Sequence, residues 1–145
     1  MALLYSIELT GSASTPRTVP NGAFVGGRIR RYRATLTLAA QTTSDYVLLA
    51  TQRTGDAFAF GIITASATLG GTAEVAIGTN ATHASNGQFR ASATFTSANT
   101  PTLFGLASAV SQAQVSAPTP IYMTIGAASL PGSGTVVVDL YFCNG

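Results

Sequence analysis

The sequence predicts an all-β protein, an antiparallel β-sandwich or jelly roll of about eight strands preceded by an extended N-terminal arm. Apolar and polar residues alternate with a period of two along most of the chain, which is the pattern of half-buried strands. Turn signals rich in Gly, Pro, Asn and Asp recur roughly every 8 to 15 residues, a spacing typical of sandwiches and jelly rolls. The chain lacks the amphipathic helices that a parallel α/β fold places between its strands.

Length and composition fit one domain with its own core. The chain has 145 residues and 46% hydrophobic residues, which argues against disorder. Only 8% of the residues are charged, against about 25% in a typical soluble domain, and all seven cations are Arg. We expect residues 1–27 to form an N-terminal strand and arm, and residues 28–145 to form the sandwich domain.

The N-terminal part is expected to begin with a strand at residues 3–9. Residues 11–27 are rich in Ser, Thr, Pro and Gly, and we expect them to form an extended arm or a long loop. The next strand, expected at residues 28–39, places Tyr32 on the apolar face of the alternation and Arg31 and Arg33 on the opposite face.

The rest of the chain supplies the remaining strands. They are expected at residues 45–51, 57–69, 73–78, 88–96, 121–125 and 135–143. Residues 46–49 are apolar enough to be buried on both faces of a sheet, and a bulge could interrupt the alternation at Ile62-Ile63. In residues 88–96 the alternation directs Phe89, Ala91, Ala93 and Phe95 inward and Arg90 outward. Residues 103–114 could form one or two helical turns.

The inventory of reactive side chains predicts no enzyme and no cofactor. One cysteine, Cys143, excludes an internal disulfide and a Cys-based zinc site, and one histidine, His83, excludes a poly-His metal centre. No serine lies in a Gly-x-Ser-x-Gly elbow. His83 lies in a polar run and is expected at the surface of a loop, and the acids are too scattered for a carboxylate pair or a calcium site. We expect no catalytic, cofactor-binding or metal-binding residues.

A cluster of arginines is the strongest local charge feature. Four of the seven Arg lie within six residues: Arg28, Arg30, Arg31 and Arg33. The guanidinium fork pairs bidentately with carboxylates, so one hypothesis is contact with an acidic partner surface. Internal pairing with Glu8, Asp45 or Asp139 is the second. Nucleic-acid binding has the least support, because the net charge is only +2 and one aromatic, Tyr32, is interleaved with the Arg.

Several strand-and-turn segments carry a family resemblance. They are residues 61–69, 72–78, 88–95 and 127–141. In these segments the chain resembles small structural proteins of tailed bacteriophages that are encoded beside major capsid proteins. The resemblance implies a β-sandwich on the head surface, as a decoration (cement) protein or the base of a head fibre, and such proteins often form trimers. It transfers no site residues.

Three hypotheses for function follow. The first is a non-enzymatic virion protein on the capsid surface, made in the host cytoplasm, whose partners are the major capsid protein and further copies of itself, with no nucleic acid and no membrane. The alternative is a head-spike or tail-fibre module that binds a receptor or glycan, although the chain has no Trp. The third, a small hydrolase or isomerase, lacks any constellation of acid, base and nucleophile.

Overall fold

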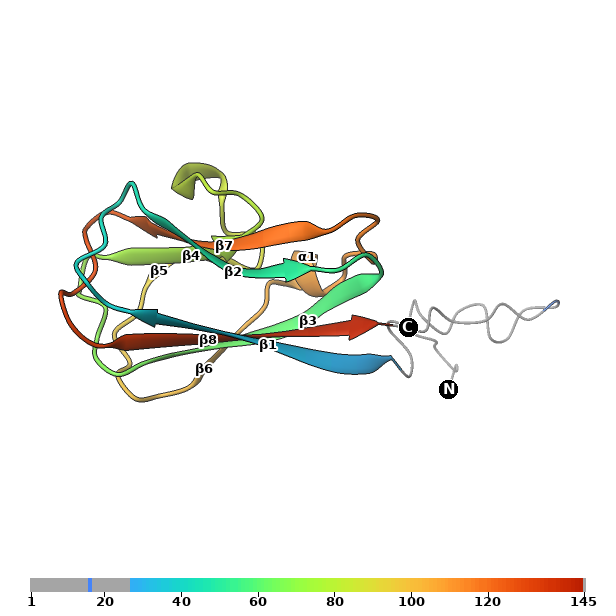
Figure 1. The fold of residues 1–145 in the computed structure, drawn as a ribbon, viewed down its shortest axis with the longest axis horizontal. Helices are drawn as coiled ribbons and strands as arrows, with labels where there is room; N and C mark the ends of the chain where they lie inside the picture. The colour runs from blue at the N-terminus through green and yellow to red at the C-terminus, as the bar shows by residue number, and fades with distance from the viewer. Residues whose placement is uncertain (1–15, 17–26, 145) are drawn as a thin grey trace, which may run out of the picture.

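The computed structural model describes residue 16 and residues 27–144. The strands, all within residues 28–144, form a sandwich of two four-stranded antiparallel sheets (Figure 1). Sheet A has the order β1 (Arg28–Thr37), β8 (Thr135–Asn144), β3 (Asp56–Ala65) and β6 (Thr102–Phe104). Sheet B has the order β2 (Tyr46–Gln52), β7 (Thr119–Gly126), β4 (Glu74–Gly78) and β5 (Arg90–Thr94). The predicted all-β sandwich of about eight strands is confirmed.

The strand pairs define the topology. The first strand pairs with the last, the second with the seventh, the third with the sixth and the fourth with the fifth, always antiparallel. An immunoglobulin-type sandwich places its first two strands side by side in one sheet. Here β1 and β2 lie in different sheets, so the order is not that of an immunoglobulin domain.

The core lies between the sheets, where inward-facing residues of β8 in sheet A meet those of β7 in sheet B. In β8 these are Val136, Val138, Leu140 and Phe142, and in β7 they are Ile121, Met123 and Ile125, none more than 1% exposed. Phenylalanine rings close the space at one end: the ring centroids of Phe58 and Phe89 lie 4.4 Å apart, and those of Phe58 and Phe142 lie 5.9 Å apart. Burial on this scale supplies most of the stabilisation of the fold.

The structure corrects two predictions about apolar runs. Residues 46–49 were expected to be buried on both faces, but Tyr46 and Leu48 are 57% and 56% exposed. The reason is that β2 is an edge strand, and the outer side of sheet B is open there. The bulge lies between Phe58 and Phe60, not at Ile62-Ile63, so Phe58 faces the core while Phe60 faces outward opposite Tyr141.

The strand expected at residues 88–96 is shorter than predicted and is irregular. Phe89 and Phe95 are buried as expected, but Ala91 and Ala93 are exposed. The register of β5 against β4 shifts, because Val75 pairs with Ala93 and Ile77 pairs with Arg90. This β-bulge breaks the simple alternation that placed the two alanines inside.

The side chain of Arg90 is half-buried at this bulge and does not extend freely into solvent. Its guanidinium donates hydrogen bonds to the main-chain carbonyls of Val75, Ala91, Ala93 and Thr94. Burial lowers the pKa of Arg90 from its usual range. The prediction that Arg90 faces out is therefore wrong, and its side chain satisfies carbonyls at the bulged edge.

The short helices lie in connections. The helical turns expected within residues 103–114 reduce to α1 (Ala107–Val110), which follows β6, and a 3-10 turn, η2 (His83–Ser85), lies in the polar connection between β4 and β5. Among the described residues no helix is long and apolar enough to cross a membrane. The predicted strand at residues 3–9 lies outside the described residues, as does most of the 11–27 arm.

Replacing Arg90 with Ala should lower the free energy of unfolding by about 2 kcal/mol, because several carbonyls at the bulge lose a charged donor. Urea denaturation followed by circular dichroism measures this change. Arg53→Ala is the control, since Arg53 lies exposed in the turn before β3, and its effect should stay below about 0.5 kcal/mol. Equal effects of the two substitutions would contradict this role for Arg90.

Candidate partner-binding surface

The four clustered arginines lie on β1, at the edge of sheet A. β1 pairs with β8 in an unbroken register of ten residues, and no described strand pairs with its other side. The predicted alternation holds: Tyr32 packs its ring edge-on against Phe142 at 5.5 Å between centroids, whereas Arg31 and Arg33 lie on the outer face.

Arg33 forms a bidentate ion pair with Asp139, its cross-strand neighbour on β8. Nε and Nη2 of Arg33 each lie 2.8 Å from a different carboxylate oxygen. These hydrogen bonds, more than its burial, hold the pKa of Asp139 below its usual range, and they raise the pKa of Arg33. Nε of Arg31 lies 3.8 Å from the same carboxylate, which is beyond hydrogen-bond distance.

Arg30 lies at the end of the sandwich near the start of β3. Its Nη1 is 3.9 Å from Oδ1 of the fully buried Asp56. That carboxylate also accepts hydrogen bonds from Nδ2 of Asn144 at 3.0 Å and from the main-chain nitrogen of Arg53 at 3.2 Å. Arg28 is exposed at the beginning of β1. The four arginines are thus divided between the outer face of sheet A and the end of the sandwich.

The internal pairs that the sequence named are formed in part. Asp139 pairs with Arg33 of β1, as one of the expected internal pairs. A second ion pair joins Arg30 to Asp56, which the sequence analysis did not name as a partner. Asp45 instead accepts hydrogen bonds from the main-chain nitrogen and the hydroxyl of Thr42, at 2.6 and 3.0 Å. Glu8 lies outside the described residues. Whether an acidic partner contacts the cluster stays a prediction.

Apolar side chains accompany the arginines on the outer face of sheet A. The rings of Phe60 and Tyr141 stack at 4.4 Å between centroids. Ile62 pairs with Leu103 of β6, which is 68% exposed, and Ile29 on β1 is 61% exposed. This face therefore combines an apolar half on β3 and β6 with a cationic half on β1.

His83 belongs to a polar cluster on the outer side of sheet B. Its Nδ1 lies 3.1 Å from Oγ1 of Thr124, and its Nε2 lies 2.9 Å from Oγ of Ser92. Ser92 donates to Oε2 of Glu74 at 2.6 Å, so the serine oxygen must accept from Nε2 of His83. The ring lies against Gly126, where a Cβ atom would clash with Nε2. The imidazole is therefore only partly exposed, where sequence reasoning expected a surface position.

This direction of donation does not activate a nucleophile. A hydrolytic serine gives its proton to the imidazole, which accepts it as a base. In this cluster the proton of Ser92 points to the carboxylate of Glu74, and the imidazole is the donor to Ser92. Among the described residues no group of three or more metal-ligating side chains gathers.

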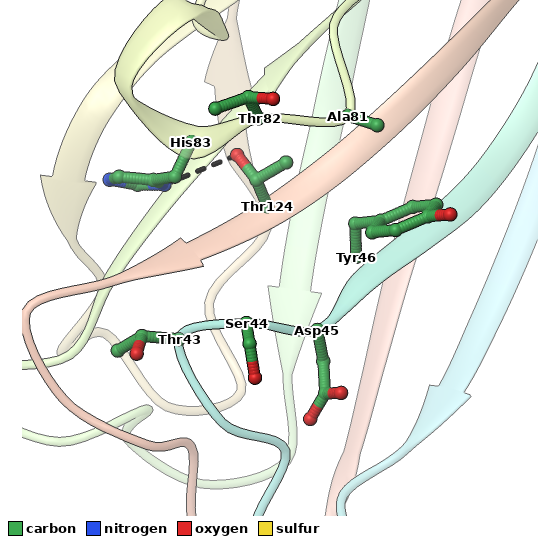
Figure 2. Close-up of a pocket in the computed structure, with 8 residues that line it drawn as sticks. All are labelled: Thr43, Ser44, Asp45, Tyr46, Ala81, Thr82, His83 and Thr124. Carbon is green, nitrogen blue, oxygen red and sulfur yellow. Dashed lines mark hydrogen bonds between the residues drawn. The ribbon is translucent and has the colours of Figure 1, made fainter.

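A groove of about 320 Å³ lies beside this cluster (Figure 2). Its lining comes from two connections and from strands β2 and β7: Thr43, Ser44, Asp45, Tyr46, Ala81, Thr82, His83 and Thr124. Figure 2 shows the side chains of Ser44 and Asp45 pointing away from Thr82 across the groove. His83 and Thr124 are hydrogen-bonded to each other, so few polar groups converge on the space.

Comparison with known proteins places the fold. No family model and no curated protein matches the sequence. A chain in the capsid asymmetric unit of cyanophage Pam1 superposes with a TM-score of 0.67 at 12% identity, covering 89% of this chain and 94% of that one. A chain in the capsid of Ralstonia phage GP4 superposes with a TM-score of 0.67 at 17% sequence identity, covering 88% of this chain and 90% of that one. A chain in the acidic stable capsid structure of Helicobacter pylori bacteriophage KHP30 has a TM-score of 0.58 at 8% sequence identity, covering 79% of this chain and 86% of that one. The fold is shared with chains of phage capsids.

Asp139→Asn should lower stability at neutral pH by about 1 kcal/mol, a value reduced because Arg33 is half exposed. The folded-state pKa of Asp139 is depressed, so its contribution is complete above the unfolded value of about 3.9 and is lost as the pH falls through the folded value. The difference in unfolding free energy between wild type and variant should therefore shrink below about pH 4. A difference that is constant from pH 7 to pH 2 would contradict the ion pair.

Proposed function

We propose that the chain is a non-enzymatic structural protein of a phage virion, a decoration (cement) protein that sits on the head and braces subunit junctions. The observation that supports this most is the fold, shared over most of both chains with three chains from phage capsids. Low sequence identity limits that likeness to the fold, so the role is argued from the surfaces of this chain.

Size and strand order support an auxiliary subunit. The superpositions cover 86–94% of the neighbouring chains, so those chains are of similar length to this one and are not large shell subunits with one similar domain. We infer from the pairs β1–β8, β2–β7, β3–β6 and β4–β5 that the sandwich is a jelly roll. Jelly rolls are a recurrent architecture of viral capsid domains.

The surface suits fixed neighbours more than free diffusion. Few charges give weak repulsion between molecules, and large apolar side chains are exposed on both sheets. The partners we propose are the major capsid protein and further copies of the chain, as a homotrimer or another homo-oligomer. Contact with the capsid is assigned to Arg28, Arg30, Arg31 and Arg33. The protein would be made in the host cytoplasm and located on the capsid surface.

A head-spike or tail-fibre module that binds a glycan is the alternative. Tyr46 is 57% exposed beside the groove of Figure 2, and an exposed aromatic ring next to hydroxyl groups is a common feature of sugar sites. The groove offers few converging polar side chains, which makes this the second candidate.

Quantitative mass spectrometry of purified particles, scaled to the major capsid protein, tests the proposal. A decoration protein covers the lattice, so hundreds of copies per particle are expected. A few copies, or a few dozen, would instead favour the spike or fibre alternative. Absence from the particle would exclude a virion protein.

Deleting residues 1–26 should abolish binding to heads that lack this protein and leave the sandwich folded. The physical reason is that an extended arm can add a strand to the edge of a neighbouring sheet, where main-chain hydrogen bonds supply affinity. Cosedimentation with such heads measures binding, and the thermal unfolding midpoint reports the fold. Binding equal to that of the full chain would exclude the arm as an anchor.

A further inference from the structure

The two central strands of sheet A are apolar on both faces. β8 reads Val-Val-Val-Asp-Leu-Tyr-Phe from residue 136 to residue 142, and β3 reads Phe-Ala-Phe-Gly-Ile-Ile from residue 58 to residue 63. Near-continuous apolar runs are typical of strands that are covered on both sides. The inner side of sheet A is covered by sheet B, but no described element lies over its outer side (Figure 1).

Sheet B differs, because its own chain covers part of its outer side. The connection that contains η2 lies against β7 and β4, so Thr124 is 1% exposed and Ala76 is fully buried. Asn86 of this connection donates to the main-chain carbonyls of Ala76 and Tyr122. Sheet A has no equivalent among the described residues. Its outer face therefore lacks a cover that the composition of its strands implies.

The residues of this outer face form rows across the sheet. One row runs from Leu103 through Ile62 and Asp139 to Arg33. The next row runs from Phe60 through Tyr141 to Arg31. A third row pairs Cys143 with Ile29. The apolar members therefore lie towards β6, and the two cations lie on β1.

The charges on the face define what can cover it. Asp139 is held by both donors of Arg33, whereas Arg31 is half exposed and lies beyond hydrogen-bond distance of that carboxylate. Among the described residues the face thus carries two cations against one anion, and the guanidinium of Arg31, half exposed, can pair with a further carboxylate. A complementary surface offers a carboxylate beside β1 and apolar side chains above β3 and β6.

A second copy of this chain does not offer such a surface. Packing the face on itself about a two-fold axis would oppose two surfaces of the same net charge. Of the other described carboxylates, Asp56 is buried, and Asp45 and Glu74 lie on the side of sheet B. Stacking sheet A of one copy on the opposite side of the next would continue without closing.

We propose that the outer face of sheet A is a docking surface for an acidic, partly apolar protein surface on the phage head, with Arg31 as its main charged contact. This rests on the proposed function and names the face and the residues through which it acts. Strands about 4.8 Å apart give this face roughly 400 Å² in plan. That is about half of what each partner contributes to a standard interface, so the rim along β1 must add to it.

A matched pair of cysteine probes tests which face docks. Ile29 and Leu48 are similarly exposed, at 61% and 56%, on edge strands of opposite sheets. Two variants of the full chain are made, each with Cys143→Ser and one new cysteine, Ile29→Cys or Leu48→Cys. Each variant is bound to heads assembled without this protein, and the alkylation of its thiol by iodoacetamide is measured. We expect the thiol at position 29 to react at least about fivefold more slowly when bound, and the thiol at position 48 to react at its free rate.

The outcomes separate this inference from the proposed function. Binding with equal reactivity changes at the two positions, or with protection at position 48 alone, overturns the docking face and leaves the virion role intact. A full chain that does not bind these heads overturns both. Each variant is first compared with the wild type by thermal unfolding, so that loss of binding is not loss of fold.

Charge reversal tests the contact by Arg31 independently. Arg31→Glu should raise the Kd for the same heads about tenfold or more, because a cation of the docking face becomes an anion facing carboxylates. Arg53→Glu makes the same charge change in an exposed turn off this face and should alter the Kd less than about twofold. Equal effects of the two reversals would overturn the assignment to Arg31.

Discussion

The register of β8 between β1 and β3 determines which side chains form the core and which form the outer face of sheet A. β8 pairs along all ten of its residues with β1 and along most of them with β3. Its alternation sends Val136, Val138, Leu140 and Phe142 into the core, and this fixes the opposite set on the outer face. A slip of one residue in this register would exchange the two sets and expose the core.

The same register sets the electrostatics of sheet A. It brings Asp139, the only anion that the described residues place on the outer face, directly opposite Arg33, which binds both carboxylate oxygens. Arg31 lies 3.8 Å from the same carboxylate and is half exposed. The register also places Tyr141 between Arg31 and Phe60, which joins the cationic and apolar halves. The surface chemistry that we assign to partner binding is therefore a consequence of the pairing that builds the core.

Alternation along the sequence predicted the features that depend on one strand alone. It identified the division of Arg31 and Arg33 from Tyr32. Asp139 was one of three internal partners that the sequence offered for the arginines, and the structure selects it. Alternation could not show that β2 lies at an edge, because an apolar run reads alike in a central and an edge strand, so Tyr46 and Leu48 were placed inside. Bulges also could not be located from the sequence. One extra residue, at Ala59 or in β5, reverses the side of the sheet to which the following residues point. The contacts of Arg90 and His83 were not predicted because their partners, main-chain carbonyls and a distant Thr124, come together only in the folded sheets.

A density map of the intact particle would show both where the chain lies and which of its faces contacts the head. We expect sandwiches repeated across the outside of the shell, with sheet A towards the capsid and Arg31 beside carboxylates of the shell. Sandwiches that contact the shell through sheet B, or that occur only at the tail, would contradict this expectation.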